Sequence, residues 1–166
     1  DLLPVEAARH RCDSGEGMSE PFAPCAGGVR MTLAPWEVEL LSLVPALLES
    51  VGRFNPDPAA DRLALRAYPH DEDADSEFCR LLESELAHSR SADRSAFALT
   101  VDAGVEGVVL STAEGEAWLR VLAEARLVQW ARAGREGGRS EADQALFEYL
   151  SWLQGSLVEI LDEVMP

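Results

Sequence analysis

The side chains best suited to form a binding site lie in the last third of the chain. Arg126 is four residues from both Leu122 and Trp130, so on a helix its guanidinium lies beside apolar side chains. Gln154 lies similarly, at the shoulder of the apolar stripe of a later predicted helix. A half-buried guanidinium needs a carboxylate, a carbonyl or an aromatic face as its partner. One interpretation is a pocket for an acidic metabolite between the two helices; the other, which we favour, is a structural hydrogen-bond network.

Trp152 is the candidate for a partner-binding side chain. It projects from its predicted helix with Glu148, Gly155 and Glu159, roughly opposite the apolar stripe. An exposed tryptophan beside a glycine can anchor a protein partner or a second copy of the chain. The alternative is that another segment of this chain covers Trp152, and the residues do not decide between the two.

The three cysteines have no zinc-ligand spacing. Cys12 and Cys25 lie in the same N-terminal segment, where they form either a redox-sensitive thiol pair or two incidental surface cysteines. Cys79 and His88 are nine residues apart, on opposite sides of a continuous helix, which rules out a nucleophile–base pair. We therefore expect no catalytic residues, no metal site and no cofactor, and a protein that is not an enzyme.

The charge is strongly acidic, with 30 acidic against 14 basic residues and a net charge of −16. Such a field repels phosphate backbones, so direct DNA binding is disfavoured and a protein partner is favoured. No stretch approaches the roughly 18 apolar residues that a membrane span needs. The first residues also lack the pattern of a signal peptide. We expect a cytoplasmic protein.

Two amphipathic helices near the C-terminus are expected to organise the fold. The first begins at the capping box Ser111–Glu114 and carries Trp118 in an apolar arc that covers more than half of its circumference. An arc this wide predicts a central helix packed on more than one side. The second helix follows a loop at residues 134–139, is capped by Ser140 and has the cleanest apolar stripe in the chain.

The remaining elements complete a mainly α fold of about five helices around this central pair. Residues 28–33 and 106–110 are predicted to pair as a small two-stranded β-ribbon. Residues 1–27 are predicted to be a flexible leader, and residues 28–166 a single helical domain. Between the strands we expect a helix that is kinked at Pro45, a short helix, and a further helix after an acidic run. The predicted inner face of that last helix consists of Phe78, Leu81, Leu82 and Leu86.

The order and spacing of several motifs resemble a small actinobacterial family long listed as a domain of unknown function. Its members carry the label AosR, an oxidative-stress transcriptional regulator. The resemblance covers residues 28–164, with Tyr149, Ser151 and Gly155 replacing a Trp, a Thr and a Glu of the family pattern. The motifs that carry it are Leu33-Ala-Pro-Trp-Glu37, Asp57-Pro58 to Tyr68, Leu110 to Leu127 with Trp118 and Arg126, and Tyr149-Leu-Ser-Trp-Leu-Gln-Gly-Ser-Leu-Val158.

The resemblance implies a cytoplasmic protein whose gene often neighbours that of the Clp protease adaptor. It also implies redox-linked transcriptional control, exerted with a sigma factor through a cysteine pair. The resemblance does not assign that pair to Cys12 and Cys25. The expected function is therefore that of a non-enzymatic regulatory protein acting by protein–protein contact. The alternative is a small-ligand-binding helical domain with a pocket near Arg126 and Gln154, and a homodimer is left open.

Overall fold

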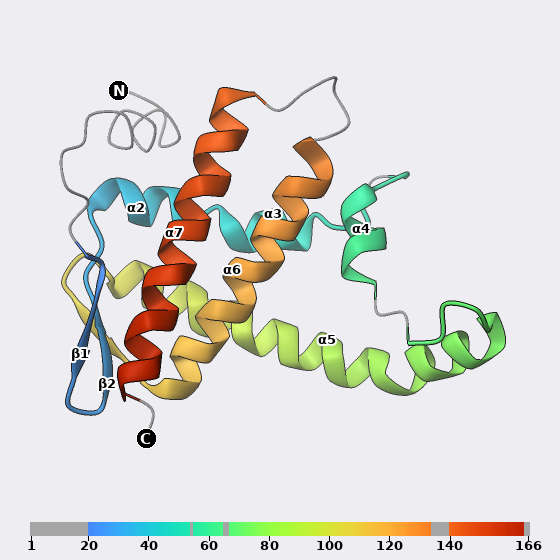
Figure 1. Cartoon of the computed structure of the whole chain (residues 1–166), viewed down its shortest axis with the longest axis horizontal. Helices are drawn as coiled ribbons and strands as arrows, with labels where there is room; N and C mark the ends of the chain where they lie inside the picture. The colour runs from blue at the N-terminus through green and yellow to red at the C-terminus, as the bar shows by residue number, and fades with distance from the viewer. Residues whose placement is uncertain (1–19, 54, 65–66, 134–139, 165–166) are drawn as a thin grey trace.

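The computed structural model describes residues 20–53, 55–64, 67–133 and 140–164 (Figure 1). It confirms the predicted class, a mainly helical chain with a small antiparallel sheet. The described elements, in chain order, are β1 (Phe22–Cys25), β2 (Gly28–Met31), α2 (Pro35–Leu41), α3 (Val44–Glu49), α4 (Pro58–Leu63), α5 (Glu72–Ala103), β3 (Val108–Leu110), α6 (Thr112–Ala133) and α7 (Glu141–Val164).

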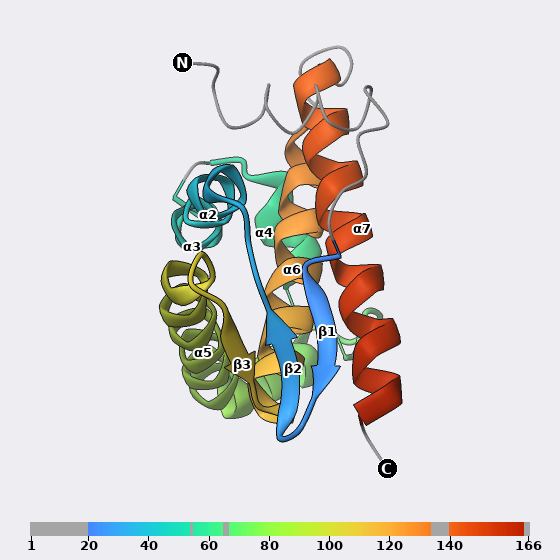
Figure 2. The same cartoon turned by 90° about the vertical axis from the view of Figure 1, so that its left-hand side faces the viewer.

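The C-terminal helix pair is central, as its apolar periodicity predicts. Helices α6 and α7 lie side by side, and α6 also contacts α3, α4, α5, β2 and β3 (Figures 1 and 2). Both predicted caps are present: the Ser111 hydroxyl accepts from the backbone N–H of Glu114, and that of Ser140 from the N–H of Asp143. The buried side chains of α6 are Gly115, Ala117, Trp118, Val121, Leu122, Ala125 and Val128.

The sheet has three antiparallel strands in the order β1-β2-β3, one more than the predicted ribbon. The pairing of β2 with β3 is confirmed, with Val29 opposite Leu110. The additional strand, β1, lies within residues 1–27, so the prediction of a leader was wrong for residues 22–25. Pro24 is tolerated there because β1 is an edge strand and one of its sides needs no donor. Phe22 is 2% exposed and meets the Trp118 ring edge-on at 6.1 Å. Residues 1–19 of the predicted leader lie outside the described residues.

A buried carboxylate joins α2 to α7. Glu37 is 5% exposed, and its carboxylate accepts from the Tyr149 hydroxyl at 3.0 Å and from the backbone N–H of Ala34 at 2.7 Å. The bond from Ala34 caps the N-terminus of α2. The bond from Tyr149 joins two residues that are 112 positions apart in the sequence. Tyr149, which belongs to the sequence motif of α7, therefore positions α2 as well as filling the core.

A second buried carboxylate joins α4 to the C-terminal end of α6. Asp57 caps α4 by accepting from the Ala59 N–H at 3.0 Å, and it also accepts from the Gly52 N–H at 3.0 Å. Arg132 of α6 donates to Asp57 Oδ2 at 2.8 Å and to the Ser50 hydroxyl at 2.8 Å. These hydrogen bonds, that of Arg132 foremost, hold the pKa of the Asp57 carboxyl well below its usual range.

This arrangement predicts a specific pH dependence of stability. Because the folded-state pKa of Asp57 lies below the ordinary value of 3.8, its ionised form stabilises the fold above about pH 4, and that contribution is lost as the pH falls further. Asp57→Asn should therefore have a lower free energy of urea unfolding at pH 7 and lose less of it between pH 5 and about pH 2. Parallel pH curves for the two proteins would contradict this role of Asp57.

Candidate functional site

The N-terminal half of α5 projects from the body of the molecule. Helix α5 has 32 residues, and its buried residues Phe97, Thr100 and Val101 all lie in its C-terminal half, which packs against α6. Residues 71–89, the capping residue Asp71 and the first half of α5, are here called the α5 arm and contain no buried residue. Figure 1 shows this arm extending beyond the ends of α4 and α6. The arm is therefore a helix whose sides are largely open.

Local interactions explain why the arm is helical without a core beneath it. Asp71 caps it by accepting from the Ala74 N–H at 3.0 Å, and acidic residues fill its first turn, where the helix dipole favours negative charge. Asp75 accepts from the backbone N–H groups of Ala67 and Tyr68 at 2.8 and 2.9 Å. These bonds attach the preceding segment to the arm. Glu77 and Arg80 form an ion pair at 2.7 Å that lowers the pKa of Glu77.

One side of the arm carries an apolar stripe that lies outside the hydrophobic core formed by the described residues. Phe78, Leu82 and Leu86 recur every fourth residue, and each is only half-buried. Tyr68 packs edge-on against Phe78, with the ring centres 5.8 Å apart. We call these four side chains the arm face. Phe78, Leu82 and Leu86 lie on the less exposed side of this helix, as predicted, although they do not join the core, and Leu81, also assigned to that side, is 63% exposed.

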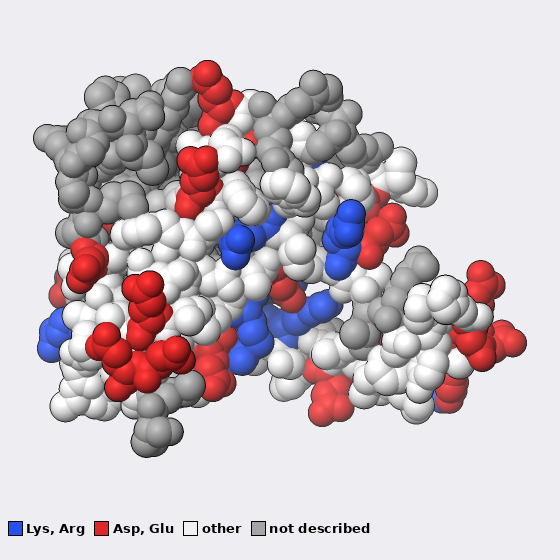
Figure 3. All heavy atoms as spheres, viewed as in Figure 1, with Lys and Arg blue, Asp and Glu red and all other residues white. Residues whose placement is uncertain are grey.

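The arm is also strongly acidic. Residues 71–88 contain seven carboxylates and one basic side chain, Arg80, which gives a net charge of −6 with histidine neutral. Figure 3 shows acidic side chains at the outer end of the arm, whereas arginines gather around the hollow in the middle of the same view. The carboxylates are those of Asp71, Glu72, Asp73, Asp75, Glu77, Glu83 and Glu85.

Arg126 and Gln154 bind each other. The Arg126 Nη1 donates to Gln154 Oε1 at 2.5 Å, and its guanidinium lies 5.1 Å from the centre of the Phe147 ring. Arg126 Nε is buried and has no acceptor among the described residues. The pair has the hydrogen bond expected of a structural link between α6 and α7, which is the interpretation favoured from the sequence. Trp118 is fully buried and donates its Nε1–H to the Thr100 hydroxyl at 2.7 Å.

Trp152 is half-buried, which lies between the two alternatives that the sequence left open, a projecting side chain and one covered by another segment. It packs against the hydrophobic core, and its ring centre lies 6.0 Å from that of Tyr149. The neighbouring candidates Glu148 and Glu159 are exposed, as predicted. The more exposed tryptophan is Trp130 of α6, 46% exposed and 5.4 Å from the Phe147 ring. The sequence signal for an exposed Trp130 was the width of the apolar arc of α6. An arc that covers more than half of a helix can extend to the surface.

The cysteines show little chemistry in the described part of the chain. Cys25 lies in β1 and is half-buried, with its thiol 3.5 Å from the Gly28 carbonyl oxygen. Its predicted redox partner, Cys12, lies outside the described residues. Within the described ranges, no cluster of three or more His, Cys, Asp or Glu side chains could hold a metal ion. A membrane-crossing helix is likewise absent from the described helices, which are too short or too polar.

Comparison with known proteins places the chain in a family. No curated protein and no solved structure matches it. Residues 19–161 match the family DUF2017, described as a domain of unknown function. The matched region includes all of the sheet, the complete α5 with its arm, α6, and α7 as far as Leu161. Because the match spans most of the sequence, the chain belongs to the DUF2017 family.

Proposed function

We propose that this protein is a non-enzymatic regulator that acts by binding a basic protein partner on the α5 arm. The observation that carries the proposal is the arm face, an apolar stripe that is only partly buried and lies outside the core, on an arm with a net charge of −6. A surface with both properties fits an amphipathic helix whose apolar side is flanked by Lys or Arg.

The energetics favour a partner of this kind. Removing apolar surface from water is worth about 25 cal/mol per Å², so covering the parts of Phe78, Leu82 and Leu86 that are still exposed contributes favourably to binding. The carboxylates around the stripe speed up association with a positively charged partner. A second copy of the chain fits less well, because two arms would bring net charges of −6 against each other.

The chemistry of the arm also fits a role in transcription. Proteins that bind nucleic acid carry basic patches, and those patches are complementary to an acidic arm. A sigma factor, the partner suggested by the AosR resemblance, is therefore a suitable candidate. Contact with such a protein allows regulation without direct DNA binding, for which the net charge of −16 is unsuited.

The experiment that tests the proposal is a peptide titration. The probe is a helical peptide with Leu at every fourth position and Lys at the flanking positions, labelled with a fluorophore. The double variant Leu82→Ser/Leu86→Ser should bind it roughly tenfold or more weakly than the wild type, since the apolar stripe is lost. Both side chains are only half-buried on the arm, so we expect the variant to keep its helical circular dichroism.

The matched control is Leu99→Ser, which makes the same change on the same helix at a residue 74% exposed and outside the arm. It should bind the peptide as the wild type does, and the wild-type affinity should fall as the salt concentration rises. Equal weakening by the control and by the double variant would show general electrostatic attraction to the protein and would overturn the proposed site. Tight, salt-resistant binding of the protein to promoter DNA would contradict the proposed mode of action.

A further inference from the structure

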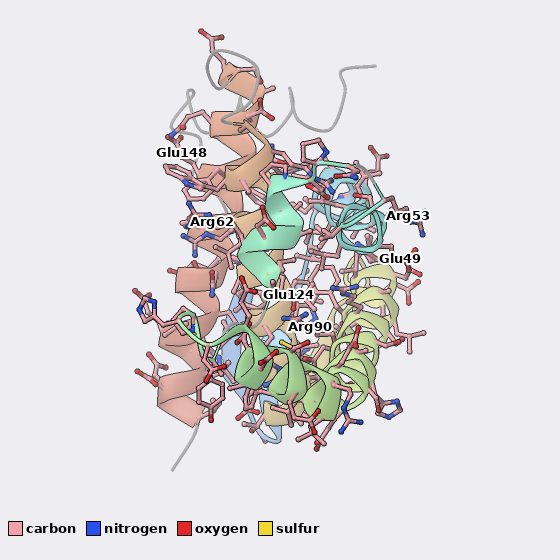
Figure 4. The ribbon with its side chains drawn as sticks, turned by 90° about the vertical axis from the view of Figure 1, so that its right-hand side faces the viewer. Glu49, Arg53, Arg62, Arg90, Glu124 and Glu148 are labelled. Atoms are coloured by element: carbon pink, nitrogen blue, oxygen red, sulfur yellow. The ribbon has the colours of Figure 1, made fainter. Side chains whose placement is uncertain are left out.

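A concave site separate from the arm face lies where α5 passes α3 and α4. This cleft has a volume of about 620 Å³, within the usual range of small-molecule pockets. Its apolar wall includes Leu48, Val51 and Leu63, all aliphatic. Its charged lining residues are Arg90 and Arg94 of α5 and, from α3, Glu49. In Figure 4, Arg90 and Glu124 approach each other between α4 and α5, and Glu49 lies at the outer edge.

The two arginines are held in place from behind by α6. The Glu124 carboxylate accepts from Arg90 Nε at 2.8 Å and from Arg94 Nη2 at 3.0 Å, and it is mostly buried. Arg90 Nη2 also donates to the Leu63 carbonyl oxygen at 3.2 Å. These contacts come from three helices and fix both guanidinium groups at the cleft. An anion that enters would meet preorganised donors, which lowers the cost of ordering the side chains on binding.

The arginines retain unused hydrogen-bonding capacity. Each guanidinium offers about five N–H groups, and among the residues that the structure describes the two together make the three bonds just given. Arg94 Nε is buried and has no acceptor among the described residues. A buried donor without a partner is unfavourable, but because Nε has almost no accessible surface, a ligand in the cleft would bind the terminal Nη groups instead. Carboxylate and phosphate groups are the anions that the guanidinium fork binds best.

The single carboxylate of Glu124 is shared by two guanidinium groups, so positive charge exceeds negative charge by one at the arginine end of the cleft, while Glu49 lies at its outer edge. A ligand with one anionic group would neutralise that excess. The described lining residues include no aromatic ring for stacking, and their aliphatic wall suits a flexible hydrocarbon chain. An anionic head group and a flexible hydrocarbon chain together describe the class of ligand that fits the cleft.

We infer that this cleft binds a small aliphatic amphiphile with one terminal anionic group. The carboxylate or phosphate head accepts N–H bonds from Arg94 and Arg90, and the chain lies against Leu48, Val51 and Leu63. The site shares no residue with the arm face, so it is independent of the proposed docking of a basic protein.

The test is a calorimetric titration of the full chain with octanoate, with octyl phosphate, and with octan-1-ol as the uncharged probe of equal chain length. Octanoate or octyl phosphate should bind, whichever head the cleft prefers, and octanol should bind roughly tenfold or more weakly. Arg94→Gln should reduce binding of the charged probe by a similar factor and leave octanol unchanged, since Arg90 still pairs with Glu124.

A second variant tests the location without altering charge. Ala98→Leu places a larger side chain in the cleft lining and should abolish binding of the charged probe, whereas Ala92→Leu, on the same helix but outside the lining, should not. The inference is overturned if neither charged probe binds, or if octanol binds as well as they do. It is also overturned if Ala98→Leu leaves binding intact. Peptide binding by the arm should be the same in all these variants, so the two proposals can fail separately.

Discussion

Trp118→Ala should cost about 3–5 kcal/mol of the free energy of unfolding, a large part of the total stability of a typical domain. The side chain is fully buried, lies 4.3 Å from Phe97 between ring centres and contacts Phe22 of β1. Its removal leaves a cavity between α6, α5 and the sheet. It also removes the donor to the Thr100 hydroxyl. Since Phe97 and Thr100 anchor the C-terminal half of α5, this contact also sets the direction of the arm.

The measurement is urea unfolding followed by far-ultraviolet circular dichroism, because a fluorescence signal would change with the loss of a tryptophan. Trp130→Ala is the matched control. It removes the same side chain from the same helix at a position 46% exposed, and it should cost much less. If the two variants had similar stability, Trp118 would not be the centre of the core.

Gly28→Ala should destabilise the protein by about 3 kcal/mol or more, because two effects add. The backbone of Gly28 has φ +146°, a conformation that other L residues rarely adopt. A Cβ atom at this position would lie 2.0 Å from the Leu110 carbonyl oxygen and 3.0 Å from its carbon. Both are backbone atoms of β3, so the overlap can be relieved only by moving β2 away from β3.

The contrasting substitution is Gly155→Ala. Gly155 lies in the middle of α7, and a Cβ there would meet no atom within 4 Å. This change should raise the free energy of unfolding by about 0.5–1 kcal/mol, as expected for replacing a glycine within a helix. Hydrogen exchange of the Val108–Leu110 amides separates the two effects. It should accelerate in Gly28→Ala and stay unchanged or slow down in Gly155→Ala. Wild-type exchange in Gly28→Ala would contradict the proposed overlap.

The predictable parts of the fold were those with a long apolar repeat. Helix α7 follows its stripe closely, with Tyr149, Leu150, Leu153, Leu157 and Leu161 all buried. The capping box at Ser111 and the cap at Ser140 were also recognised correctly, because each depends on residues only a few positions apart. Local signals were sufficient for these elements.

The missed features depend on contacts between distant residues. Strand β1 has four residues and includes Pro24, so its pattern is too short to detect, and it forms because β2 provides its pairing edge. The arm was missed although its apolar pattern is clear. Phe78, Leu82 and Leu86 have the periodicity of a buried helix, but periodicity does not show where the rest of the body ends. The cleft at Arg94 combines residues from α3, α4 and α5 and leaves no local signature.

The most direct measurement of the central claim is site-specific photo-crosslinking in cells that produce this protein. A photoreactive amino acid is introduced in place of Leu82 on the arm face, and separately in place of Leu99 as the exposed control. We predict that position 82 forms one dominant adduct with a basic protein, identified by mass spectrometry, and that this adduct is absent from position 99. The absence of any adduct from position 82, or the same adducts from both positions, would contradict regulation by contact through the α5 arm.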